Sequence, residues 1–312
     1  ASSGGHQGPF HRSHSFSRVV IKASLPIEAG AGAELEDALY ELAPSNWSLV
    51  VSHLDGKGLL EGFFDSKEQA VVAGRELESL LGEPFAVPFD LKELIDRDWK
   101  EAYKHHFHPW AHDNVHWVPI WEKESYLVPE DHHALYLDPG MAFGTGNHET
   151  TRLCLQALVS ILADRANQVA DCLDVGCGSG ILSLSASLLG IRTVKGVDCD
   201  PDAIKVSIDN ASLNSIEGKV DFETLPLEDL PEGKQYDVVL ANIQADVLLK
   251  NSDLLVGQVR DGGTLVLSGI LTREMEKVEA GFLERIDAMG AKTSPKRESL
   301  NEWSSLRFNL GK

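Results

Sequence analysis

Two acidic residues stand where the chain passes from apolar strands into loops, in positions from which they could share one ligand. Asp174 opens the run Asp-Val-Gly-Cys-Gly-Ser-Gly, which joins an expected strand at 172–175 to an expected helix at 181–189, and Asp198 ends the next apolar strand, 193–197. Glycines let the backbone turn sharply and let a ligand reach the peptide groups. The first turn of the helix offers unpaired N–H groups, and an acid on the next strand suits both hydroxyls of a ribose. The pattern indicates a nucleotide-type cofactor site.

The glycine-rich run allows three interpretations, and the spacing of its glycines helps to choose between them. A glycine-rich turn can join a strand to a helix without binding a ligand, and the nicotinamide fingerprint also combines glycines with a distant acid. Here the spacing is G-x-G-x-G instead of G-x-G-x-x-G, and an acid stands two residues before the first glycine. That acid can meet the amino group of a methionine moiety, which a dinucleotide lacks. We therefore predict S-adenosylmethionine as the cofactor, with contacts at Asp174, Gly176, Gly178 and Asp198.

A second glycine-rich segment, 138–151, precedes an apolar helix expected at 152–163. Two such loops in one domain can hold opposite ends of one ligand, with Phe143 as a wall of the site, Thr145 as a further contact and Thr151 as a hydrogen-bond donor. The alternative is a loop that only caps the helix, with Thr150 or Thr151 as its N-cap residue.

Two residues are candidates for the chemical step. Asn242 lies near the end of the apolar segment 236–243, and ligands of open α/β sheets lie beyond the carboxyl ends of the strands. Its amide can accept from an attacking amine and orient it; the alternative is an N-cap for a helix that starts near Ala245. His148 is the candidate general base, although solvent can also take the proton.

The first 92 residues show the element order β-α-β-β-α-β. Each expected helix carries its apolar residues on one face. The expected strands are 19–23, 49–51, 60–64 and 85–89, and the expected helices are 34–42 and 67–81. This order predicts a small ferredoxin-like α+β domain. Because the segment contains no catalytic constellation, we interpret it as a recognition domain.

Residues 90–107 are expected to form a connecting helix, with Asp90 as its N-cap, an apolar stripe along one side and Pro109 at its end. From Ala134 to about Ile270 strands and helices alternate, which predicts an α/β parallel sheet covered on both faces, and the end of the chain reads as strand. The predicted domains are a disordered segment or processing remnant at 1–15, a substrate-recognition domain at 16–92, a helical connector at 93–110 and a cofactor-binding domain at 111–312.

Composition narrows the class of protein. A formal charge of −20 repels phosphate backbones and attracts basic partners, so we expect no direct nucleic-acid binding, although acidity can also simply favour solubility. No apolar run approaches the roughly 20 residues that cross a bilayer, so we expect no membrane association. We expect a monomer in the cytoplasm, or in an organelle matrix if residues 1–15 remain from a removed targeting peptide.

Cysteines and histidines do not predict a metal site. The cysteines have no C-x-x-C spacing and look like small buried hydrophobes of a reducing compartment. They are Cys154, Cys172, Cys177 and Cys199. A run of histidines is dense enough to suggest a metal ion, but its spacing crosses a helix end, a proline and a loop. These are His105, His106, His108, His112 and His116.

Longer motifs resemble one family. They occupy 98–100, 107–109, 138–151, 174–182, 196–203, 241–243 and 267–270. From about residue 93 to the end, the chain resembles the PrmA family, the methyltransferases of protein eleven of the large ribosomal subunit. The resemblance implies a seven-strand, Rossmann-like class I methyltransferase domain carried on a connector from a small substrate-recognition domain. It also implies a basic ribosomal protein as partner, methylation of its lysines or N-terminal amine, and cofactor contacts at Thr151, Gly176, Asp198 and Asn242.

One residue departs from the family pattern. Gln244 follows Asn-Ile, where the family usually continues with leucine. If Gln244 faces the acceptor, another protein or a small molecule becomes an alternative substrate. A non-catalytic cofactor-binding scaffold is the alternative from a different functional class, and the intact set of Asp174, Asp198 and Asn242 argues against it.

Overall fold

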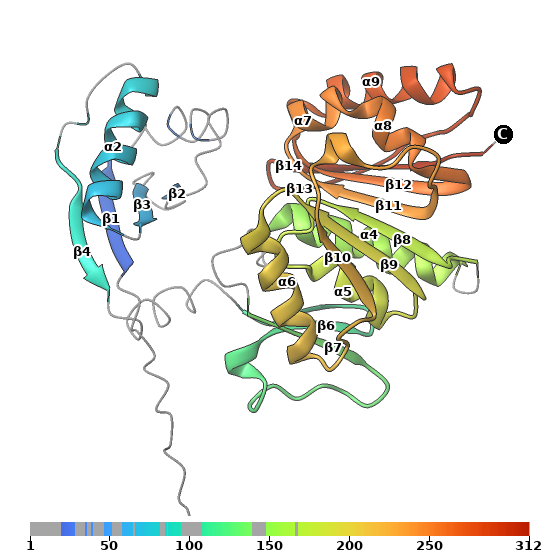
Figure 1. The fold of residues 1–312 in the computed structure, drawn as a ribbon, viewed down its shortest axis with the longest axis horizontal. Coiled ribbons are helices and arrows are strands. Elements are labelled where there is room, and N and C mark those ends of the chain that lie inside the picture. The colour runs from blue at the N-terminus through green and yellow to red at the C-terminus, as the bar shows by residue number, and fades with distance from the viewer. Residues whose placement is uncertain are drawn as a thin grey trace, which may run out of the picture. The chain divides into compact units, whose positions relative to one another are not determined.

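A computed structural model describes residues 20–28, 35, 39, 47–51, 58–64, 66–81, 85, 87–94, 108–138, 148–165 and 168–311. The chain divides into two compact units, residues 1–105 and 106–312 (Figure 1). Within the described ranges, no helix is long and apolar enough to cross a membrane.

The N-terminal unit contains a four-stranded antiparallel sheet in the order β2-β3-β1-β4. Its elements are β1 (Val20–Ile27), β2 (Trp47–Val51), β3 (Gly58–Phe64), α2 (Lys67–Leu81) and β4 (Asp90–Leu94). Leu25, Leu60 and Leu77 form a buried cluster between the sheet and α2, against which the helical residues Leu35 and Leu39 also pack. The predicted bounds of the 67–81 helix are confirmed, and three of the four predicted strands overlap observed ones.

The prediction of a helix at 90–107 is wrong for its first residues. Asp90 is the first residue of β4, which pairs with β1 from Val20↔Leu94 to Ser24↔Asp90. Pairing with a neighbouring strand outweighs the local helical pattern of the sequence. The strand predicted at 85–89 therefore lies too early, and residues 93 and 94 belong to this sheet instead of a connector. Residues 95–107 lie outside the described residues.

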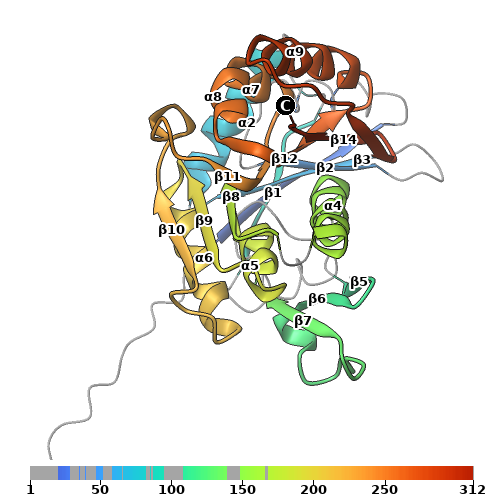
Figure 2. The ribbon, with the colours of Figure 1, turned by 90° about the vertical axis from the view of Figure 1, so that its right-hand side faces the viewer.

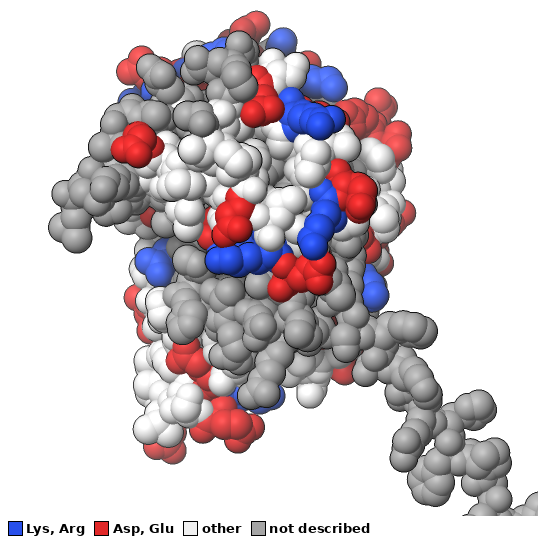
Figure 3. All heavy atoms as spheres, turned by 90° about the vertical axis from the view of Figure 1, so that its left-hand side faces the viewer, with Lys and Arg blue, Asp and Glu red and all other residues white. Residues whose placement is uncertain are grey.

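Charges of both signs alternate on the described surface of the N-terminal unit. Lys22 forms an ion pair with Glu61, and Lys67 approaches Glu93 at 2.7 Å. In the face drawn in Figure 3, Lys and Arg side chains likewise lie among Asp and Glu side chains. The described atoms of this face therefore do not form a patch of a single sign.

The C-terminal unit is built on a seven-stranded sheet in the order β10-β9-β8-β11-β12-β14-β13. The strands are β8 (Asp171–Val175), β9 (Thr193–Asp198), β10 (Val220–Thr224), β11 (Tyr236–Asn242), β12 (Val259–Leu271), β13 (Lys296–Leu300) and β14 (Trp303–Asn309). The strands from β10 to β12 are parallel, whereas β14 and β13 are antiparallel to their neighbours. Chain order reverses between β8 and β11, and ligands of such sheets lie beyond the strand ends at this point.

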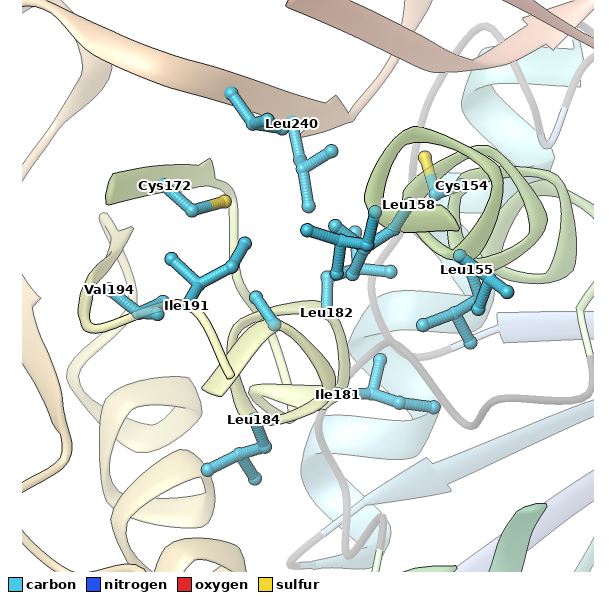
Figure 4. Close-up of a cluster of buried hydrophobic side chains, with 14 of the residues drawn as sticks. Cys154, Leu155, Leu158, Cys172, Ile181, Leu182, Leu184, Ile191, Val194 and Leu240 are labelled. Atoms are coloured by element: carbon cyan, nitrogen blue, oxygen red, sulfur yellow. The ribbon is translucent and has the colours of Figure 1, made fainter. Parts of the chain in front are cut away.

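Helices cover both faces of this sheet (Figures 1 and 2). They are α4 (Glu149–Arg165), α5 (Ile181–Leu188), α6 (Pro201–Leu213), α7 (Ala245–Lys250), α8 (Ser252–Gly257) and α9 (Met275–Ala288). Because side chains of a strand alternate between faces, Cys172 packs with α4 and α5 in one buried cluster (Figure 4), while Leu173 packs with α7, α8 and α9 in the other. Three of the cysteines are buried as expected, but Cys199 is exposed, which corrects that expectation.

A separate three-stranded sheet precedes the seven-stranded one in the chain. It consists of β5 (Trp110–His112), β6 (Val115–Pro119) and β7 (His133–Leu137), with β6 and β7 parallel. Trp117 joins it to the main domain, since its indole N–H donates to Ser185 Oγ on α5 at 2.8 Å. The segment from Ala134 is therefore a parallel strand as predicted, but it belongs to this second sheet.

Candidate active site

The loop between β8 and α5 has the backbone conformation that its glycines permit. Gly176, Gly178 and Gly180 have φ values of 70°, 53° and 80°, in the left-handed region that L-residues with a Cβ avoid. The N–H groups of Gly176 and Cys177 both donate to Val197 O, at 2.9 and 3.0 Å. The glycine-rich loop is therefore fixed to the end of β9, beside Asp198.

Asp174 is fully buried beneath this loop. Its Oδ2 accepts hydrogen bonds from Ser183 N–H at 3.0 Å and from Ser183 Oγ at 2.6 Å, whereas its Oδ1 has no hydrogen-bond partner among the described residues. Burial raises the pKa of the Asp174 carboxyl to about 7, although the two hydrogen bonds from Ser183 lower it, and the Asp198 carboxylate raises it further. A cation at Oδ1 would offset the cost of burying the charge.

Asp198, at the end of β9, accepts hydrogen bonds from two turns, the glycine-rich loop and the turn that leads into α6. Its Oδ2 accepts from Gly178 N–H at 2.9 Å and its Oδ1 accepts from Asp200 N–H at 3.0 Å. Asp200 in turn caps α6 by accepting from Asp202 N–H at 2.9 Å. Each carboxylate oxygen has more than one lone pair, so Asp198 can still accept hydrogen bonds from two ligand hydroxyls.

Asn242 meets the first turn of α4. Its Nδ2 lies 3.3 Å from Thr151 Oγ1, and its Oδ1 is buried without a hydrogen-bond partner among the described residues. Ser268, opposite Asn242 on β12, donates from Oγ to Thr150 O at 3.0 Å and so ties the same turn of α4 to the sheet. The alternative role of Asn242 as a helix cap is wrong, because Gln244 occupies the N-cap position of α7.

His148 immediately precedes α4. The helix begins at Glu149, so Thr150 and Thr151 lie within its first turn and the alternative that either is the N-cap is wrong. Instead, His148 Nδ1 accepts from Thr150 N–H at 3.3 Å and lies 2.8 Å from Thr150 Oγ1, while the imidazole ring packs edge-on against Trp303.

The donor and acceptor in the contact between His148 Nδ1 and the Thr150 hydroxyl depend on the ring tautomer. Burial lowers the pKa of the imidazole below its usual range, against the opposing effects of Glu149 and Glu302. Burial therefore favours the neutral ring, which is the form of histidine that can accept a proton. The general-base role of His148 stays a prediction.

Ile243 is held between two glycines. A Cβ at Gly176 would lie 2.5 Å from Ile243 Cγ2, and a Cβ at Gly269 would lie 2.4 Å from Ile243 O. Glycine at both positions therefore lets the segment after β11 lie close to the glycine-rich loop and to β12. Gln244, which follows, is half-buried and makes no capping hydrogen bond.

Six predicted site residues thus gather at the carboxyl ends of β8, β9 and β11 and the first turn of α4. They are Thr151, Asp174, Gly176, Gly178, Asp198 and Asn242. Phe143 and Thr145 lie outside the described residues. Ser183 and Ser268 also belong to the site, but their types and spacing carry no signal in the sequence without the fold.

The histidine-rich segment forms a local hydrogen-bond chain. His116 Nδ1 lies 2.7 Å from Tyr126 Oη, and His116 Nε2 lies 2.7 Å from His132 Nδ1. Among the residues that the structure describes, no group of three or more histidines, cysteines or carboxylates is arranged to hold a metal ion. His105 and His106 lie outside those residues.

The site thus combines a buried carboxylate oxygen for a cation, a second carboxylate for hydroxyls, and a buried amide oxygen for a hydrogen-bond donor. Asp174, Asp198 and Asn242 supply these groups. This set fits the ammonium and ribose groups of S-adenosylmethionine together with an amine acceptor.

Comparisons with known proteins agree with this chemistry. A family model described as ribosomal protein L11 methyltransferase (PrmA) matches residues 24–309. The ribosomal protein L11 methyltransferase of Geobacter sulfurreducens is 39% identical over 276 residues, covering 82% of this chain and 88% of the relative. The corresponding protein of Citrifermentans bemidjiense is 41% identical over 220 residues, covering 69% and 68%.

A solved structure agrees as well. The ribosomal protein L11 methylase of Lactobacillus delbrueckii subsp. bulgaricus has a TM-score of 0.58 and 27% sequence identity. The match covers 66% of this chain and 100% of that one.

Gly176→Ala is expected to destabilise the protein more than Gly218→Ala. The two glycines have φ values of 70° and 72°, so alanine brings a similar backbone penalty of about 1–2 kcal/mol at either position. Only at Gly176 would the new Cβ also meet Ile243, since nothing lies within 4 Å at Gly218. Chemical unfolding should therefore show an additional loss of roughly 1–3 kcal/mol for Gly176→Ala, from overpacking. Equal losses for both variants would contradict the close packing of Ile243 on the loop.

Proposed function

Since the chain belongs to the ribosomal protein L11 methyltransferase family, we propose that its site transfers a methyl group to lysine side chains or the N-terminal amine of that ribosomal protein. The chain is an S-adenosylmethionine-dependent methyltransferase with a Rossmann-like sheet. The single observation that supports this use of the site most strongly is a pair of buried oxygens at one edge of the sheet, Asp174 Oδ1 and Asn242 Oδ1, for which the described residues supply no hydrogen-bond partner.

In this proposal, different residues of the site bind different parts of the cofactor. Asp174 Oδ1 binds the ammonium group, and the Asp198 carboxylate binds the ribose hydroxyls. Gly176 and Gly178 allow close approach to the loop backbone. By their place in the family motif, Phe143, Thr145 and Thr151 complete the binding site.

S-adenosylmethionine supplies a methyl group on a positively charged sulfur, which is already an activated leaving group, so no metal or covalent enzyme intermediate is needed. The chain has to hold a neutral amine near that methyl group and exclude water. Asn242 is suited to the first task because its Oδ1 is buried and can accept an N–H of the amine, while Thr151 holds its Nδ2. Fixing the amide in this way leaves its oxygen preorganised for the acceptor.

The acceptor must lose a proton before it attacks, since the pKa of a lysine ammonium is about 10.4. Transfer from water into the site lowers that pKa because burial disfavours the charged form. We propose solvent as the proton acceptor, with His148 as the alternative, since burial favours its neutral ring.

We propose that the N-terminal unit is a ferredoxin-like domain that recognises the protein substrate. Its support is the antiparallel sheet order β2-β3-β1-β4, with α2 packed on it. The charge of −20 favours a basic partner. We further propose a monomer that works without direct nucleic-acid contact in a reducing compartment such as the cytoplasm, in keeping with its free buried cysteines.

The direct test is to incubate the full chain with methyl-labelled S-adenosylmethionine and a mixture of ribosomal proteins, and to identify the labelled protein and residues by mass spectrometry. We expect label on amines of ribosomal protein L11. Label on a different protein would support the alternative substrate, and cofactor binding without any label would support the non-catalytic scaffold.

A shortened chain that begins at His106 provides a second arm of the same experiment. It contains every described residue of the site and is expected to bind cofactor without labelling the protein substrate. Full labelling by this shortened chain would contradict the recognition role of the N-terminal unit.

Asn242→Ala is expected to lower kcat and kcat/KM together, because an amide that orients the amine acts mainly on the transition state. A loss of roughly 10²-fold is the scale for removing one preorganised hydrogen-bonding group. The matched control is Asn251→Ala, since Asn251, the residue that follows α7, donates from Nδ2 to Val247 O in that helix at 2.9 Å. The control should reduce the melting temperature but leave single-turnover rates near normal. A folded Asn242→Ala variant with unchanged single-turnover rate would remove Asn242 from the mechanism.

A further inference from the structure

Helix α6 presents a polar stripe to the two glycine-rich segments. Ser207, Asn210 and Asn214 are three and four residues apart, which places them on one side of the helix. The side chains of Ser207 and Asn210 are fully buried. Buried polar groups need hydrogen-bond partners, and here most of those partners are backbone groups of segments that lie far away in the sequence.

Asn210 contacts both glycine-rich segments with a single side chain. Its Oδ1 accepts from Asp138 N–H at 2.8 Å, and its Nδ2 donates to Ser179 O at 2.9 Å. Asp138 begins the segment 138–151, which leads to His148 and Thr151, and Ser179 lies inside the loop 176–180. The amide thus fixes the spacing between the two segments that supply the predicted cofactor contacts.

Ser207 adds a second attachment to the same loop. Its Oγ donates to Gly178 O at 2.8 Å. A Cβ at Gly180 would lie only 2.8 Å from the same Ser207 Oγ. The helix therefore lies against the loop as closely as glycine allows. Its first residues follow the Asp198–Asp200 turn, so one rigid helix connects Asp198 to the backbone of the glycine-rich loop.

Asn214 makes comparable hydrogen bonds, but to β7 and α6 instead of to this loop. Its Oδ1 accepts from Tyr136 N–H at 2.8 Å, and its Nδ2 donates to Tyr136 O at 2.6 Å and to Asn210 O at 2.8 Å. It joins α6 to β7 with as many hydrogen bonds but has no contact with residues 176–180. Asn214 is therefore a matched control for Asn210.

We propose that Asn210 is a positioning residue for the methyl donor, which sets the affinity for S-adenosylmethionine by holding the loop 176–180 and the start of the segment 138–151 against α6. This inference rests on the proposed cofactor site. When Asn210 is lost, Ser179 O and Asp138 N–H lose the hydrogen bonds of this side chain, so the direct link between the loop and Asp138 is removed and both are less restrained. The free protein must then order them upon binding, which weakens affinity because the ordering cost appears in the binding equilibrium.

The test compares Asn210→Ala with Asn214→Ala in the full chain. S-adenosylmethionine affinity is measured by calorimetry, melting temperature is measured without cofactor, and the single-turnover rate is measured at saturating cofactor. Asn210→Ala should raise Kd roughly 10-fold, equivalent to about 1.4 kcal/mol, with a single-turnover rate near that of the unchanged chain. Asn214→Ala should reduce the melting temperature similarly but leave Kd unchanged.

Hydrogen exchange provides a readout that does not depend on the cofactor. Amides of residues 176–180 should exchange faster in the cofactor-free Asn210→Ala variant than in Asn214→Ala, because local opening of the loop becomes easier. If Asn210→Ala does not fold, Asn210→Asp and Ser207→Ala decide the question. The first keeps an acceptor for Asp138 N–H but removes the donor to Ser179 O. The second removes the contacts of Ser207 Oγ with Gly178 O and Cys177 Sγ, both within the loop, and both variants should raise Kd.

Unchanged affinity in a folded Asn210 variant would overturn the inference. So would equal losses of affinity in the Asn210 and Asn214 variants, because general destabilisation would then explain both. A failure of the unchanged chain to bind S-adenosylmethionine would contradict the proposed function itself and is thereby distinguished from failure of this inference.

Discussion

The site depends on a buried carboxylate, that of Asp174, for which the described residues supply hydrogen bonds to only one oxygen. Removing an ionised carboxylate from water is costly unless its oxygens are hydrogen-bonded or paired with a cation. Ser183 satisfies one oxygen of Asp174 with two hydrogen bonds, and these bonds also tie the first turn of α5 to the end of β8. The other oxygen, which no described residue bonds, can accept from a ligand beneath the loop whose conformation that attachment restrains.

The parallel sheet brings Asp174 together with the other residues of the site. Asp174, Asp198 and Asn242 come from three strands that end at the same edge, next to the reversal of chain order. Their positions are secured by contacts with backbone groups or with neighbouring helices, such as Gly178 N–H to Asp198 and Asn242 to Thr151. Because these supports belong to rigid elements, the groups are oriented before any ligand arrives, which limits the ordering cost of binding.

Sequence reasoning found the parts of the site that local patterns determine. The glycine-rich run, the acid at the end of β9 and the amide at the end of β11 were predictable because strand ends and left-handed glycines leave local signatures. Asp90 was misjudged because its strand is defined by pairing with β1, a contact distant in sequence. The cap of α4 was misjudged because an imidazole, which standard N-cap preferences do not favour, takes that place. Asn210 was missed for the same reason as Ser183, since its partners become neighbours only in the folded chain.

The most direct measurement of the central claim is the pKa of the Asp174 side chain, followed by NMR of its carboxyl carbon with and without S-adenosylmethionine. In the free protein burial raises this pKa from 3.8 to about 7, so the folded state binds the proton more tightly than the unfolded chain, and stability falls as pH rises through that interval. If Asp174 receives the ammonium of the cofactor, its pKa must fall upon binding, because a neighbouring positive charge favours the carboxylate. An Asp174 pKa that is unchanged by the bound cofactor would contradict the account.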